Sequence, residues 1–124
     1  MEQNNRFEKG ITTVKEMVPE ETFRMMENME KVSPDFWEMI VGFGFGEVYS
    51  RKGLSLTQRE IITLTALITQ GAFDQLEVHI RAALQIGLTQ DEIKEIIIQC
   101  AAYAGFPKAT QAMQIAGKIF ESVK

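Results

Sequence analysis

Apolar side chains recur every three to four residues through most of this 124-residue chain, which is the period of an amphipathic α-helix. The clearest stripe runs from Ile93 to Ala104, directly after Thr89 and Glu92, which match the capping-box pattern of a helix start. No run of strand length alternates apolar and polar residues. The pattern therefore predicts an all-α fold, a compact bundle of about six to seven helices, and the length fits a single domain over 1–124.

Prolines, glycines and capping residues mark the ends of the expected helices. The predicted segments are 6–18, 22–32, 34–43, 58–71, 74–87, 90–104 and 107–120. Ser33 is the expected N-cap before Pro34, and Thr57 and Glu60 match a second capping box. The segment 58–71 is apolar nearly all round, which predicts a central place in the core.

The sequence GFGFG at 42–46 is similar at first sight to a glycine-rich phosphate-binding loop. No strand precedes it, however, and the residues between its glycines are bulky aromatics, which disfavours phosphate binding. We interpret it as the end of a helix at a place where the backbone passes close to another element.

Composition excludes several classes of site. The 13 basic and 17 acidic side chains give a net charge of −4 without a basic cluster, so nucleic acid is not an expected partner. The single cysteine, Cys100, excludes an intramolecular disulfide and a C-x-x-C motif, and the single histidine leaves no multi-His metal site. A secretory signal and an apolar run of roughly 18 residues are both absent, so we expect a cytoplasmic protein without a membrane partner.

His79 is the main candidate for chemistry, and it lies on or beside the apolar stripe of its predicted helix. Two interpretations stay open: a core histidine satisfied by one carbonyl or carboxylate, or a group that gives and takes a proton near neutral pH. Glu60 is likewise either a capping residue or a partner for the histidine. Cys100 occupies a core position, where a thiol behaves as a small hydrophobe.

Three arginines, Arg51, Arg59 and Arg81, lie near these residues in the sequence. A guanidinium group binds a carboxylate through two parallel hydrogen bonds, so these residues would suit a small anionic substrate. Their closeness in sequence does not by itself place them around one site.

Four segments, read in order, resemble the carboxymuconolactone decarboxylase family. They are FWEMI at 36–40, FGEVYSRKGL at 45–54, LEVHIRAA at 76–83 and YAGFP at 103–107. The resemblance implies an alkylhydroperoxidase D-like helical subunit that forms a homo-oligomer, usually a hexamer built as a trimer of dimers, with sites near subunit contacts. Seven methionines and an alanine-rich last helix agree with the oligomer.

Peroxidase relatives in this superfamily carry the motif E-x11-C-x2-C-x3-H. The same frame here reads Glu60, Ala72, Gln75 and His79, so both cysteines are missing. Without a peroxidatic and a resolving thiol, dithiol peroxide reduction is not expected.

The decarboxylase resemblance implies that no metal or organic cofactor is required, because the substrate spreads the charge left by carbon dioxide through its conjugated ring. Our hypothesis assigns His79 as proton donor or oxyanion partner, oriented by Glu60. Arg51, Arg59, Arg81 and Gln75 are the candidate substrate-binding residues. The pathway decarboxylases have an acidic residue in place of Gln75 and commonly lack Glu60, so this chain has either moved the carboxylate to the neighbouring helix or lost the activity.

Two other functions remain open at this stage. The first is a peroxiredoxin-like enzyme that uses Cys100 alone with an external thiol. The second is a non-catalytic ligand-binding or scaffolding oligomer.

Overall fold

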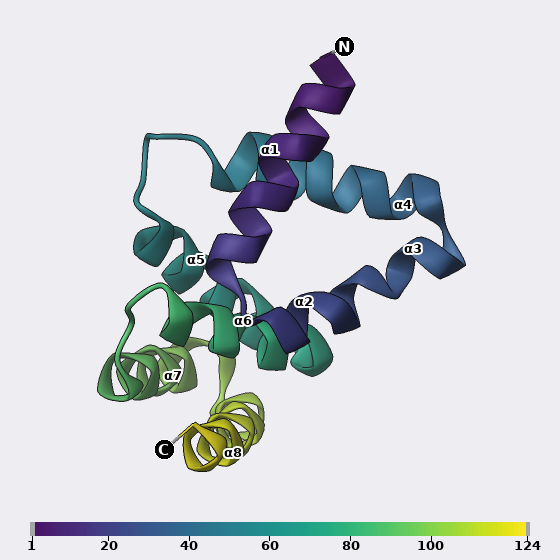
Figure 1. Cartoon of the computed structure of the whole chain (residues 1–124). Coiled ribbons are helices and arrows are strands. Elements are labelled where there is room, and N and C mark those ends of the chain that lie inside the picture. Colours follow the sequence, from purple (N-terminus) through teal and green to yellow (C-terminus); the bar gives the residue numbers. More distant parts are fainter. Residues whose placement is uncertain (1, 124) are drawn as a thin grey trace. The chain divides into compact units, whose positions relative to one another are not determined.

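The structure is a computed structural model that describes residues 2–123, with side chains from Asn5 onward. Within that range every regular element is a helix and no strand occurs, which confirms the all-α prediction (Figure 1). The elements are α1 (Glu2–Met17), α2 (Glu20–Glu27), α3 (Met29–Val32), α4 (Pro34–Met39), the π-helix η1 (Ile40–Tyr49), α5 (Leu56–Gln70), α6 (Phe73–Gln85), α7 (Gln90–Ala104) and α8 (Phe106–Ser122).

These described elements exceed the predicted number because two of the expected helices are each divided in two. Asn28, a residue of low helix propensity, separates α2 from α3. The helix that begins at Pro34 changes from α to π geometry at Ile40. Ser33 accepts a hydrogen bond from the Phe36 amide at 3.1 Å, so the predicted N-cap is confirmed.

The chain divides into two compact units between Leu56 and Thr57. We call them the N-terminal unit, with α1 to η1, and the C-terminal unit, with α5 to α8, although the first residue of α5 falls on the N-terminal side of the division. Each unit is described by itself below. The expectation of a single domain over 1–124 stays a prediction.

In the N-terminal unit, glycines leave the room that α1 and η1 need to pack closely against each other. A Cβ added to Gly10 would collide with the Val41 carbonyl oxygen, and one added to Gly46 would collide with the Arg6 carbonyl oxygen. The two helices therefore approach backbone to backbone, as the glycine-rich sequence predicted. The prediction that a helix ends among these glycines is wrong, because the chain stays helical to Tyr49 and uses the missing side chains for helix contact.

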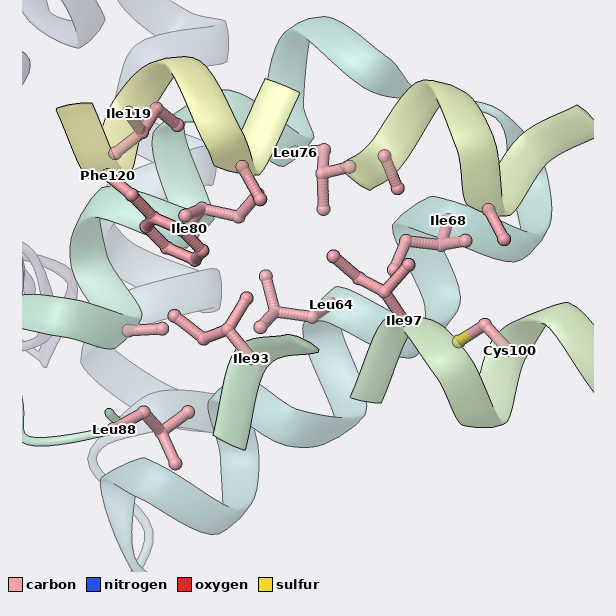
Figure 2. Packing of buried hydrophobic residues seen from close by; sticks show 14 residues of the cluster. Leu64, Ile68, Leu76, Ile80, Leu88, Ile93, Ile97, Cys100, Ile119 and Phe120 are labelled. Atoms are coloured by element: carbon pink, nitrogen blue, oxygen red, sulfur yellow. The ribbon is translucent and has the colours of Figure 1, made fainter. Parts of the chain in front are cut away.

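The C-terminal unit is organised around apolar side chains from all four of its helices (Figure 2). The buried cluster comprises Leu64, Ile68, Leu76, Ile80, Ala83, Leu88, Ile93, Ile97, Cys100, Ala109, Ala112, Ala116, Ile119 and Phe120. At the start of α7 the Thr89 side chain accepts from the Glu92 amide, while the Glu92 carboxylate accepts from the Thr89 amide. That predicted capping box is confirmed.

Two expectations for α5 are wrong. The helix begins at Leu56, so Thr57 lies inside it and is not the N-cap. Its surface is not buried all round: Glu60, Leu64 and Ile68 form one buried face, whereas Ile62 is 56% exposed. The spacing of four residues along the buried face places the glutamate in line with the core leucine and isoleucine.

Candidate functional site

Glu60 and His79 meet between α5 and α6, inside the C-terminal unit. Both carboxylate oxygens of Glu60 lie 3.1 Å from the histidine Nδ1. The Glu60 side chain has no solvent exposure and that of His79 is 16% exposed. Glu60 lies one turn before Leu64, and His79 directly precedes the buried Ile80, so the core of this unit fixes both side chains.

The contact assigns roles to the two ring nitrogens of His79. An ionised carboxylate can only accept hydrogen bonds, so Nδ1 carries the proton that is donated to Glu60. Proton exchange with a substrate then belongs to Nε2. The pairing also offsets the cost of burying the glutamate charge, which would be severe for an isolated carboxylate.

The pair bears on both interpretations of the histidine. A core histidine with one carboxylate partner fits the Nδ1 contact. An oriented imidazole that is held by a buried carboxylate and retains some exposure also has the arrangement of a general acid or base. Of the two interpretations of Glu60, the structure shows the contact with His79 and not the capping role.

The remaining candidates are placed differently. Gln75 lies one turn before His79 on α6, so the two share a face, and Gln75 is exposed. Arg81 lies two residues after His79, about 200° further round the helix, and its Nη2 is 3.5 Å from a Glu77 carboxylate oxygen. The structure therefore does not bring Arg81 to the histidine face of α6.

Arg59 is next to Glu60 on α5, and Arg51 belongs to the N-terminal unit. Both arginines already interact with other groups. Their roles in substrate binding stay predictions, as does that of Arg81.

Cys100 is 4% exposed within the core of the C-terminal unit. Burial raises the pKa of its thiol, and a hydrogen bond with Thr65 offsets the rise only in part. A raised pKa lowers the fraction of reactive thiolate, so the geometry disfavours a peroxidase that depends on this thiol alone.

Two further kinds of feature, a metal centre and a membrane span, are absent from the described part of the chain. No group of three or more His, Cys, Asp or Glu side chains there could hold a metal ion. None of the helices in residues 2–123 combines the length and the apolar character that a membrane span needs.

The sequence analysis did not predict one concave region of the structure. It lies in the N-terminal unit and includes Arg6 and Lys9 of α1. Their spacing of three residues, which puts two cations on one face of a helix, was the available signal. The part that η1 contributes falls where the sequence predicted the end of a helix among glycines, so it was not expected to share a face with α1.

Comparison with known proteins gives relatives whose matches cover from 77% to 99% of this chain. The chain is 36% identical over 124 residues to the 4-carboxymuconolactone decarboxylase of Acinetobacter baylyi, covering 99% of this chain and 92% of the relative. It is 32% identical over 113 residues to the nitrosuccinic acid decarboxylase of Metarhizium robertsii, covering 90% and 79%. An uncharacterized 15.0 kDa protein of Paracoccus denitrificans is 34% identical over 97 residues, covering 77% and 72%.

The sequence profile of the carboxymuconolactone decarboxylase family matches residues 34–118, a range that contains Glu60, Gln75 and His79. The four segments singled out above lie within this range. The resemblance is therefore confirmed, and the chain belongs to the carboxymuconolactone decarboxylase family.

Proposed function

We propose that this protein decarboxylates a small carboxylated lactone or a related organic anion, with His79 and Glu60 as the pair that handles the proton. The observation that carries the proposal is the contact of both Glu60 oxygens with Nδ1 of His79. The reaction class is supported by two relatives whose names describe decarboxylation.

The substrates in those two names differ, but their chemistry has a common element. A conjugated lactone carbonyl and a nitro group can both accept the electron pair that remains when carbon dioxide leaves. The carbon–carbon bond breaks, its electron pair moves onto that acceptor, and a proton then adds to carbon. In this scheme the protein must bind the anion, exclude water from the departing carboxylate and deliver the proton.

His79 is the proton donor in this scheme, through Nε2. Its imidazole is charged before transfer and neutral afterwards, and it regains a proton from solvent. Glu60 stabilises the charged ring and keeps Nδ1 protonated throughout, so the same nitrogen always faces the reaction. A guanidinium group binds the carboxylate that remains on the substrate, and Arg59, next to Glu60 on α5, is the candidate within the same unit.

The position of Glu60 bears on whether this chain has kept the activity. Family decarboxylases were expected to have an acidic residue at the place of Gln75, one turn before the histidine on α6. Here a carboxylate reaches the same imidazole from α5. This arrangement supports relocation of the carboxylate rather than loss of the activity.

We also propose that the protein forms a homo-oligomer and lies in the cytoplasm. A homo-oligomer, a hexamer as a trimer of dimers, agrees with large apolar side chains that are exposed on single helices, such as Ile98 at 55% and Phe106 at 74%. The cytoplasmic location and the absence of a nucleic acid partner stay predictions. Sedimentation at micromolar concentration tests the assembly, and a monomer there would contradict it.

The decisive experiment measures carbon dioxide release and the accompanying ultraviolet change with 4-carboxymuconolactone and, separately, with nitrosuccinate. We expect turnover of one of them, and His79→Asn should lower kcat by about 10²- to 10⁴-fold. Glu60→Gln, which keeps the shape but removes the charge, should lower kcat and alter its pH profile.

Glu95→Gln is the matched control, because this exposed glutamate of α7 lies outside the pair. Its kcat should equal that of the unaltered protein, and circular dichroism would verify that every variant is folded. Release of no carbon dioxide from either substrate, or full activity in folded His79→Asn, would refute the proposal.

A further inference from the structure

Within α6, which the structure describes in full, Gln75 is the one polar neighbour of His79 on the helix surface. Such neighbours lie three and four positions away, and for His79 they are Gln75, Leu76, Ala82 and Ala83. The last three are apolar and have no solvent exposure, whereas Gln75 is exposed. A polar group of α6 that acts together with the imidazole therefore comes from Gln75.

The directions of the two side chains bring them together. Side chains of an α-helix lean toward its N-terminus, so the His79 ring extends over the turn that carries Gln75. The Glu60 carboxylate, 3.1 Å from Nδ1, fixes the ring there. The Gln75 amide makes no hydrogen bond within the described part of the chain, so it can turn toward a group that is bound at the ring.

An amide at this position offers an anion something that a carboxylate does not. The NH₂ group of a glutamine donates two hydrogen bonds, whereas an ionised carboxylate only accepts them. A second carboxylate beside the histidine would also repel an anionic ligand. Since Glu60 already supplies a carboxylate from α5, position 75 can present a neutral donor while the imidazole stays oriented.

The proposed decarboxylation needs such a donor at one oxygen atom of the substrate. As carbon dioxide leaves, negative charge develops on an oxygen of the group that accepts the electron pair. His79 delivers its proton to carbon in this scheme, so that oxygen needs a donor of its own. A donor to the departing carboxylate would slow the reaction, because that group loses its charge, whereas a donor to the acceptor oxygen is strengthened in the transition state.

We propose that Gln75 is the hydrogen-bond donor to the acceptor oxygen on which negative charge develops. The carbon–carbon bond to the departing carboxylate breaks, and the displaced electron pair reaches that oxygen, where the Gln75 amide stabilises it. The pair returns to carbon as the proton passes from Nε2 of His79, and the amide keeps both of its protons throughout. This inference rests on the proposed function and adds the residue that stabilises its intermediate.

Gln75→Met tests this role in turnover, because methionine keeps the length of the side chain and removes the amide. With a substrate that the protein decarboxylates, kcat should fall by about 10²-fold while KM changes by less than about threefold. Gln75→Glu should lower kcat as well. Its rate relative to the unaltered chain should recover as pH falls toward about 4.3, where the carboxyl group gains a proton that it can donate. A purely structural role for Gln75 would not produce this recovery.

A binding experiment tests the donor without turnover. The probe is the nitronate of 3-nitropropionate, whose negative charge lies on oxygen as in the proposed intermediate, and the reference is 3-nitropropionate with its neutral nitro group. Isothermal titration calorimetry on the full chain measures each form in a buffer that preserves it. Gln75→Met should weaken nitronate binding by about 10- to 100-fold, and binding of the nitro form by less than about threefold.

Gln85→Met is the matched control, since this exposed glutamine also belongs to α6 but lies about 240° further round the helix than His79. It should bind the nitronate as the unaltered chain does, and circular dichroism verifies that both variants are folded. Unchanged nitronate binding in folded Gln75→Met, equal weakening in Gln85→Met, or no nitronate binding by the unaltered chain would each overturn the inference.

The two assays separate this inference from the proposed decarboxylation. Nitronate binding that depends on Gln75, in a protein that releases no carbon dioxide, would refute the decarboxylation and retain the oxyanion donor. Carbon dioxide release with full kcat in Gln75→Met would retain the decarboxylation and refute the donor.

Discussion

Each of the two units is stabilised internally by a different kind of contact. In the C-terminal unit, apolar side chains from α5 to α8 interdigitate in one buried cluster (Figure 2). In the N-terminal unit, α1 and η1 approach so closely that Gly10 and Gly46 have no room for a Cβ. The first kind of contact depends on the volume of side chains, and the second depends on their absence.

The units also differ in whether their charged side chains are buried or exposed. The C-terminal unit buries a carboxylate completely and pairs it with its histidine. The N-terminal unit keeps the cations Lys9 and Arg51 exposed around an open hollow. A buried pair suits proton transfer in a low-dielectric setting, whereas exposed cations suit the capture of anions from water.

The largest effect on stability is expected from Leu64→Ala in the C-terminal core. Leu64 is 1% exposed, so its loss should lower the free energy of unfolding by about 2–5 kcal/mol through lost burial and a residual cavity. Ile62→Ala on the exposed face of α5 is the control, and it should cost less than about 1 kcal/mol. Urea unfolding followed by circular dichroism measures both, and equal losses would mean that α5 buries a different face.

A smaller effect is expected from Gly46→Ala in the N-terminal unit. The added methyl group collides with backbone of α1, which should cost about 1–3 kcal/mol of unfolding free energy. Gly44→Ala is the matched control, since nothing lies within 4 Å of a Cβ there, and it should be neutral or stabilise the helix. If the two variants are equally stable, α1 and η1 are not in backbone contact.

The fluorescence of Trp37, the single tryptophan, decides whether the two units unfold as one. Trp37 is buried in the N-terminal unit, where its ring makes an edge contact with Phe23 at 6.1 Å between centroids. If 1–124 is a single domain, Leu64→Ala should shift the fluorescence and circular dichroism transitions together. A shift in circular dichroism alone would establish two independent domains.

The smallest effect is expected from titration of Cys100. Burial raises the pKa of this thiol above its ordinary value of 9.0, so the folded state favours the neutral form. The resulting stabilisation is fully present below that ordinary value and is lost as pH rises through the folded pKa. The free energy of unfolding should therefore fall at alkaline pH, and Cys100→Ala should flatten the fall. Rapid labelling of the native thiol at neutral pH would contradict this placement.

The sequence predicted some elements well because their signals are local. The capping residues Ser33 and Thr89 and the apolar stripe of α7 depend only on neighbours within a turn or two. The capping box assigned to Thr57 and Glu60 failed because the same glutamate has a partner on another helix. A local pattern cannot reveal a competing contact made nineteen residues away.

The candidate site was predicted in part for the same reason. The spacing placed His79 beside a buried stripe, and Glu60 was left with two interpretations, a capping residue or the partner of the histidine. Neither could tell that Arg81 turns to Glu77 rather than toward the histidine face, or that Arg6 and Lys9 join η1 around a hollow. Those outcomes depend on helix phase and on packing between helices.

The sequence by itself determined the helical class, most helix boundaries, the family and the chemical groups at hand: one imidazole, one thiol, carboxylates and arginines. These follow from periodicity, local capping and composition. Only the tertiary structure decided that the glycines at 42–46 continue a helix. Only the tertiary structure also decided that Glu60 contacts His79 and does not cap the start of α5. A glycine or a buried carboxylate is compatible with several local conformations, and the element packed against it selects one of them.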